Sequence, residues 1–98
     1  MTAHWLLFYD YVPDYRERRG EFRAAHFEHA QAHRDRGELL MAGAFADPAD
    51  GAVLAFRTDD RGVVERFAEE DPYNRNGLIT GWRVRRWVMV MGDGAETP

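Results

Sequence analysis

Three histidines in one segment are the first side chains that suggest chemistry. His29 and His33 lie four residues apart, so on a helix their rings share a face and have the spacing of two metal ligands. A zinc site needs three or four protein ligands, yet the chain has no cysteine and no second cluster of histidines and carboxylates. We therefore predict no metal site and interpret His29 and His33 as surface or half-buried helix positions.

His26, the remaining histidine of this segment, has a different setting. At about 100° per residue it falls on the same side of the helix as Phe22 and Ala30, which is the expected inward stripe. A partly buried imidazole needs a hydrogen-bond partner. A carboxylate partner would make it a usable general base, whereas a lone histidine on an apolar helix face is usually structural.

Asp71 is the candidate partner. It follows an acidic, helix-like stretch directly, and Pro72 biases it away from the helical conformation. Two interpretations stay open: Asp71 simply ends the helix, or it is held in place to pair with His26. The pair would support proton abstraction, elimination or activation of a water molecule.

Other residues would complete such a site. Arg23 is suited to hold an anionic group of the substrate. Tyr9, together with Tyr11 and Phe8, would supply an aromatic wall, and the stretch between Asp71 and Trp82 would form a wall or lid.

The amino-acid composition excludes several other kinds of catalytic or structural chemistry. The chain contains no cysteine, lysine or serine, which excludes disulfides, Schiff-base lysines and cysteine or serine nucleophiles. It contains no strong nucleotide, haem or flavin motif, so we expect no cofactor. Acid–base chemistry on a small-molecule ligand is what remains.

Charge and hydropathy limit which kinds of partner the chain can bind. A formal net charge of −4 without a basic patch makes the chain a poor nucleic-acid binder. No apolar run approaches the ~18 residues of a membrane span, and the first residues do not resemble a signal peptide. We expect a cytoplasmic protein with no nucleic-acid or membrane partner.

Secondary-structure signals predict how these residues are positioned. We expect strands at 5–12, 39–45, 52–57 and 82–91, and helices over 14–36 and 62–70. Gly20 would separate a short first turn from the main helix, and Gly37 would end it. We assign 1–92 to a single domain and 93–98 to a flexible C-terminal tail.

The order βαββαβ predicts an α+β, ferredoxin-like fold. Its four-stranded antiparallel sheet would carry both helices on one face. The chain has nothing left to cover the other face, so we expect a homodimer formed through the open sheet face.

Short motifs carry a resemblance to a known family. Arg23-Ala-Ala-His26-Phe27, the run from Gly37 to Gly43, and Asp71-Pro72-Tyr73 occur in an order and at distances that resemble the YciI-like (YCII-related) family. The resemblance covers about 5–92. The segment Tyr15-Arg16-Glu17-Arg18-Arg19 departs from shorter members and would reshape the pocket.

The resemblance implies a dimeric α+β barrel with His26 and Asp71 as the catalytic pair. It also implies that Arg23 and Tyr73 line the same cleft and that the chemistry is of lyase or hydrolase type. We therefore expect a cofactor-independent acid–base enzyme acting on a small anionic or phenolic molecule. The alternative is a non-catalytic small-molecule-binding or accessory domain; cofactor-free monooxygenases are a third option by analogy of fold alone.

Overall fold

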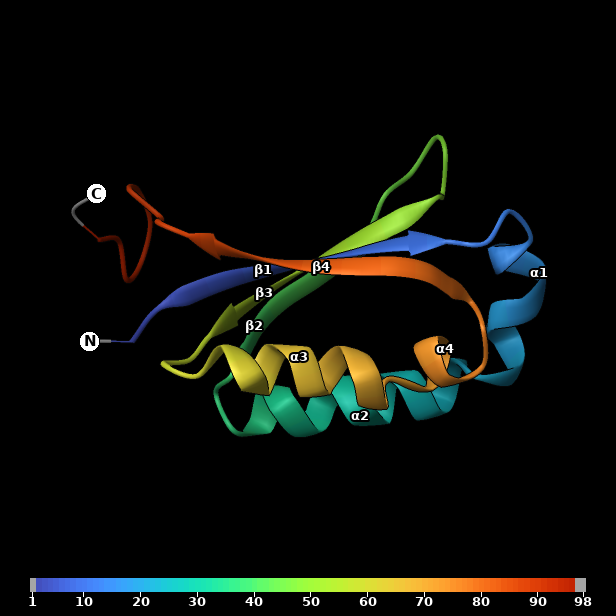
Figure 1. Cartoon of the computed structure of the whole chain (residues 1–98), viewed down its shortest axis with the longest axis horizontal. Helices are drawn as coiled ribbons and strands as arrows, with labels where there is room; N and C mark the ends of the chain where they lie inside the picture. The colour runs from blue at the N-terminus through green and yellow to red at the C-terminus, as the bar shows by residue number, and fades with distance from the viewer. Residues whose placement is uncertain (1, 97–98) are drawn as a thin grey trace.

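A four-stranded antiparallel sheet carries all the helices on one face (Figure 1). The structure is a computed structural model that describes residues 2–96. The elements are β1 (His4–Tyr11), α1 (Tyr15–Arg18), η1 (Arg19–Glu21), α2 (Arg23–Asp35), β2 (Leu39–Ala44), β3 (Gly51–Arg57), α3 (Arg61–Glu70), α4 (Pro72–Arg75) and β4 (Ile79–Trp87). The strand order β2-β3-β1-β4 confirms the predicted ferredoxin-like α+β fold.

The helical segment expected over 14–36 breaks near Gly20, as the sequence predicted. A short helix and a 3₁₀ turn that contains Gly20 precede α2. Gly37 ends the segment with a φ of 77°, in the left-handed region that glycine adopts without a Cβ penalty. The break redirects the chain, so that α1 and η1 lie at one end of the sheet and α2 runs beneath it (Figure 1).

The core forms between the sheet and the helices. Leu7, Tyr9 and Tyr11 alternate along β1 toward the helical layer, and they pack in one cluster with Phe67 of α3 and Tyr73 of α4. Phe8 points to the opposite face, where the Arg83 guanidinium lies 4.5 Å from its ring centroid. The expectation that Phe8 helps to wall the site is therefore wrong.

The last strand differs from the prediction of 82–91. It begins at Ile79, because the partner strand β1 extends to Tyr11, with which Ile79 pairs. It ends at Trp87, because Trp87 pairs with His4, the first residue of β1. The apolar run beyond Trp87 thus has no strand to pair with, and Val90 and Met91 are exposed.

The expected wall or lid between Asp71 and Trp82 is also corrected. Pro72–Arg75 form the short helix α4, and only residues 76–78 connect it to β4. Gly77 makes the bend, with a φ of 76°. Tyr73 is the one residue of this stretch found in the lining of the cavity described below.

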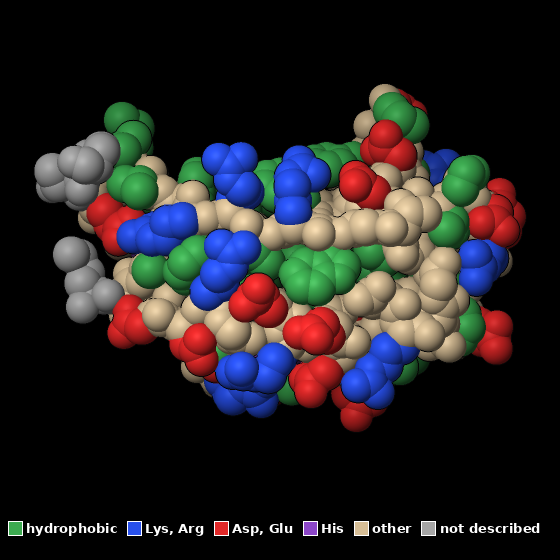
Figure 2. Space-filling view, in the orientation of Figure 1, with side chains coloured by type: hydrophobic (Ala, Val, Ile, Leu, Met, Phe, Trp, Pro, Cys, Tyr) green, Lys and Arg blue, Asp and Glu red, His purple; other side chains and the backbone are tan. Residues whose placement is uncertain are grey.

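The far face of the sheet is apolar at its centre. Leu6, Phe8 and Val53 are half-buried there and Met41 is exposed. Figure 2 shows acidic and basic side chains mixed over the helical layer, and hydrophobic side chains visible behind basic ones along the upper edge of the view. No element of residues 2–96 covers this face as the helices cover the other (Figure 1).

The chain end lies against the start of β1. Glu96 forms an ion pair with Arg86, at 2.9 Å. Residues 97 and 98 of the expected flexible tail, and residue 1 of the expected domain, lie outside the described residues. No helix within residues 2–96 has the length and hydropathy required to cross a membrane.

Candidate active site

The carboxylate of Asp71 is the centre of the site. Asp71 is fully buried, and its two oxygens accept hydrogen bonds from three separate elements. Oδ1 accepts from His26 Nδ1 of α2 at 2.8 Å and from the Tyr73 backbone N–H of α4 at 2.9 Å. Oδ2 accepts from the Tyr9 hydroxyl of β1 at 2.8 Å. Such bonds offset the cost of burying a charge.

Local sequence explains how a carboxylate comes to lie at this point. Asp71 has an extended backbone after α3 and is also the N-cap of α4, with Pro72 at the first helical position. The Asn74 side chain donates to the carbonyl of Ala68 at 2.9 Å and so satisfies the end of α3. Asp71 therefore ends one helix and begins another.

His26 presents one ring edge to Asp71 and the other to a cavity. Its Nδ1 lies 2.8 Å from the carboxylate, so Nδ1 carries the hydrogen of the neutral ring. The ring lines the cavity, and its Nε2 forms no hydrogen bond within residues 2–96. The ring stacks on Tyr73, with centroids 3.8 Å apart and planes 6° from parallel. In the neutral ring with its hydrogen on Nδ1, the unprotonated nitrogen is Nε2, which is the state required of a general base.

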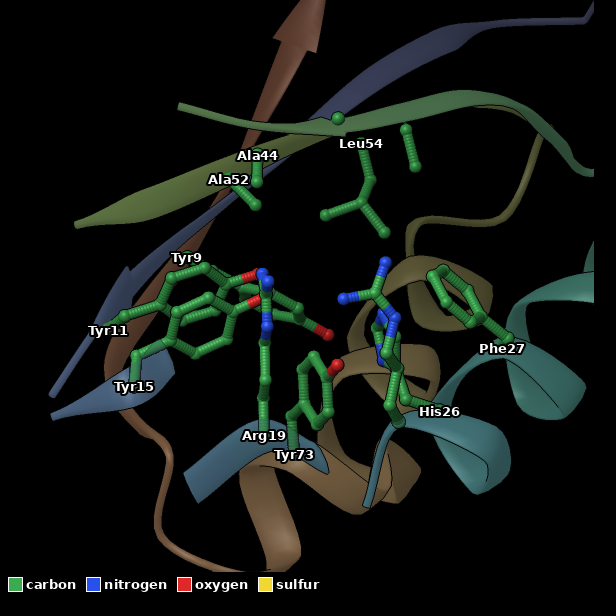
Figure 3. A pocket seen from close by; sticks show the side chains of 13 residues that line it. Tyr9, Tyr11, Tyr15, Arg19, His26, Phe27, Ala44, Ala52, Leu54 and Tyr73 are labelled. Carbon is green, nitrogen blue, oxygen red and sulfur yellow. The ribbon is translucent and has the colours of Figure 1, made fainter. Parts of the chain in front are cut away.

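The cavity measures about 240 Å³ and lies between the sheet and the end of α2 (Figure 3). Its lining combines tyrosine hydroxyls, two guanidiniums and a floor of small apolar residues. The lining residues are Tyr9, Tyr11, Tyr15, Arg19, Arg23, His26, Phe27, Ala42, Gly43, Ala44, Ala52, Leu54 and Tyr73. Figure 3 shows His26 and Tyr73 together on one side of the space, with Ala44, Ala52 and Leu54 opposite them.

The tyrosines of the site are held in their neutral form. Burial, reinforced by the Asp71 carboxylate, raises the pKa of Tyr9 far above its ordinary range. Burial and the neighbouring Tyr15 raise the pKa of Tyr11 as well, and raise that of Tyr73 to about 12. All three are therefore hydrogen-bond donors at neutral pH.

The structure brings the predicted site residues together. His26, Asp71, Tyr9 and Tyr73 form one contact cluster, and Arg23 lines the same cavity. Tyr9 was predicted to touch the substrate; its hydroxyl is instead bonded to Asp71, while its side chain still lines the cavity.

Sequence reasoning did not assign roles to Tyr15 and Arg19. Both line the cavity and lie in the segment Tyr15-Arg16-Glu17-Arg18-Arg19, for which we expected an effect on the pocket. Tyr11 and Tyr15 stack with ring centroids 3.8 Å apart. Ala42 and Gly43 of β2 also line the cavity; they lie in the motif run from Gly37 to Gly43, but no role in a site was assigned to them.

His29 and His33 pack in the structure instead of facing a cavity together. His29 Nε2 lies 3.0 Å from the carbonyl oxygen of Phe67, and His33 Nδ1 lies 2.9 Å from Glu38 Oε1. Within residues 2–96, no three histidine, aspartate or glutamate side chains are grouped to hold a metal ion. His29 is half-buried, as expected, whereas His33 is buried, so the expected surface or half-buried position of His33 is wrong.

Replacing Tyr9 with phenylalanine tests the support of Asp71. Tyr9→Phe leaves Oδ2 buried without its donor, so we expect a loss of about 1–3 kcal/mol in the free energy of unfolding, measured with urea. Tyr11→Phe is the control, because it removes a hydroxyl from the same face of β1 without removing a bond to Asp71. Equal unfolding midpoints for the two variants would contradict the account.

The burial of His33 predicts how stability depends on pH. Burial, aided by the charge of Arg36, lowers the pKa of His33 from its ordinary value of 6.5. The unfolded chain then binds this proton more readily, so the free energy of unfolding should decrease as pH falls below 6.5 and should stop decreasing below the folded pKa. Urea titrations at several pH values should show a smaller decrease for His33→Gln than for wild type. An identical decrease would rule out this origin.

Comparison with known proteins places the chain in a family. The model of the YCII-related domain matches residues 3–88. No curated protein matches the sequence. Among solved structures, 5-chloro-2-hydroxyhydroquinone dehydrochlorinase from Burkholderia phenoliruptrix, in complex with 2,5-dihydroxybenzoquinone, has a TM-score of 0.75 at 20% identity, covering 95% of this chain and 99% of that one.

Two further structures share the fold at lower identity. A protein from Bacteroides thetaiotaomicron, assigned by name to the antibiotic biosynthesis monooxygenases, has a TM-score of 0.63 at 12% identity, over 99% of this chain and 96% of that one. A NIPSNAP family protein from Agrobacterium tumefaciens has a TM-score of 0.59 at 11% identity, over 97% of both chains. These likenesses show the fold alone, whereas the family model spans most of the sequence. The chain belongs to the YCII-related domain family.

Proposed function

We propose that the protein is a cofactor-independent acid–base enzyme of lyase type that acts on a small phenolic molecule. The observation that carries the proposal is the setting of His26, whose Nδ1 is bonded to a buried carboxylate while its ring lines a cavity and its Nε2 forms no hydrogen bond within residues 2–96. A structural histidine needs no cavity at its free nitrogen.

The geometry supports a two-step proton transfer. Nε2 of His26 takes a proton from a ring hydroxyl, and the Asp71 carboxylate stabilises the resulting imidazolium. The imidazolium then returns the proton to a ring carbon, which gives the keto tautomer without net change of atoms. If that carbon bears a halogen, the halide would next leave with the C–X electron pair while a second ring hydroxyl gives its proton to His26 Nε2, so that the products are a quinone and hydrogen halide.

Size and lining favour a single hydroxylated ring. A cavity of about 150 Å³ is enough to hold benzene, so about 240 Å³ accommodates one substituted ring. Tyrosine hydroxyls provide donors for ring oxygens, and the small floor residues leave space for the ring face. The dehydrochlorinase with the same fold acts on a compound of this kind by its name.

A non-catalytic binding domain is the second candidate. It is favoured by the structural work that Asp71 already does, because the carboxylate caps α4 and holds Tyr9 whether or not turnover occurs. In that case the cavity would bind a phenol without changing it.

We also propose a homodimer through the open sheet face. The half-buried Leu6, Phe8 and Val53 and the exposed Met41 form an apolar surface that a second copy would cover. Sedimentation should give twice the 11.4 kDa of one chain, and Val53→Glu should yield monomers. Ala24→Glu, on the exposed side of α2, is the matched control; a monomeric wild type would refute the dimer.

Isotope exchange tests the catalytic proposal without knowledge of the natural substrate. Ring hydrogens of benzene-1,2,4-triol in anaerobic D₂O should exchange faster with the protein present, because the keto tautomer takes deuterium from His26. General acid–base catalysis contributes about 10²–10⁴-fold, so His26→Asn and Asp71→Asn should each lose at least about 100-fold of the acceleration in proton NMR.

Glu70→Gln is the control for charge, since it removes the exposed carboxylate next to Asp71. Its exchange rate should equal that of wild type. Binding of the triol without any acceleration by wild type would reject the enzyme and favour the binding domain.

A further inference from the structure

Two guanidiniums of the cavity have no acidic partner. Within residues 2–96, neither Arg19 nor Arg23 forms an ion pair, although most other arginines of the helical layer do. Each lies instead against an aromatic ring: Arg19 Cζ is 5.4 Å from the Tyr15 ring centroid, and Arg23 Cζ is 4.9 Å from that of Phe27. Stacking positions the charges without neutralising them.

Both charges reach the part of the cavity beside His26. Arg19 and Arg23 line the cavity together with His26 and Tyr73. The Tyr73 ring in turn stacks on His26 at 3.8 Å. Figure 3 shows the Arg19 side chain extending into the space in front of the tyrosine rings.

Nothing acidic balances these charges at the cavity surface. The residues of the described chain that line it include two arginines and no aspartate or glutamate, since Asp71 is enclosed behind His26 and Tyr9. Apolar walls from β2 and β3 reduce screening, which strengthens attraction to an anion. The cavity therefore favours a negatively charged ligand over its neutral form.

We propose that Arg19 and Arg23, with the Tyr73 hydroxyl, form an anion site that selects single-ring aromatic monoanions. The ionised oxygen of the ring lies against the two guanidiniums, and a second ring substituent lies at His26 Nε2. Arg19 is then a specificity-determining residue supplied by the turn between α1 and α2. The choice of a hydroxylated ring rests on the proposed function, whereas the preference for an anion rests on the charges alone.

Ionisation of a coloured ligand measures this preference directly. 4-Nitrocatechol changes its absorption when it loses its first phenolic proton, so a titration with protein reports both affinity and charge state. Tenfold tighter binding of the monoanion corresponds to loss of that proton about one pH unit lower than in free solution. We expect the wild-type protein to show such a displacement.

Arg19→Gln should weaken binding of the monoanion on the order of 10- to 100-fold and abolish the displacement, because a charged hydrogen-bond partner is lost. Arg16→Gln is the matched control: it removes the same charge from an exposed residue of α1 that does not line the cavity. 4-Nitrobenzoate serves as a second probe, in which a carboxylate supplies the charge. Dependence on Arg19 with either probe supports the anion site and identifies the oxygen that it prefers.

Binding that is equal for wild type and Arg19→Gln with both probes, or preference for the neutral catechol, would overturn the inference. The result is separable from the proposed function. Charge-selective binding without isotope exchange would remove the enzyme and keep the anion site. Exchange that is unaffected by Arg19→Gln, together with charge-independent binding, would keep the enzyme and remove the anion site.

Discussion

The burial of one carboxylate is the constraint on which the site depends. Asp71 has no access to solvent, so each of its oxygens needs donors from the protein. Those donors come from β1, α2 and α4, which ties the sheet to both helical segments at one point. The same bonds orient His26, because its Nδ1 is one of the donors. The hydrogen bonds that satisfy the buried carboxylate in the fold therefore also orient the His26 ring.

The cavity beside His26 supplies the other features of the candidate site. The His26 ring lines a space whose walls also carry tyrosines, small apolar residues and two guanidiniums that form no ion pair within residues 2–96. A base, an anion site and room for one ring are the parts that proton transfer on a phenol requires.

Much of the fold and of the candidate site could be predicted from the sequence. Helical periodicity placed His26 on the inward face, and the Asp-Pro pair marked Asp71 as fixed in direction. The bond between Tyr9 and Asp71 could not be predicted, because 62 residues separate them and only the folded sheet brings them together. The cap of α4 was missed because a four-residue helix has no periodicity. The bounds of β4 were misplaced because the partner strand, and not its own composition, sets where pairing starts and stops.

The tautomer of His26 tests whether Asp71 orients this ring as a general base. Long-range nitrogen–proton NMR at a pH where the ring is neutral distinguishes a hydrogen on Nδ1 from one on Nε2. We expect the Nδ1–H form, in which Nδ1 donates to Asp71 and Nε2 carries no hydrogen. An Nε2–H form would contradict it, because Nδ1 would then face the carboxylate without a hydrogen and the cavity would meet a donor in place of a base.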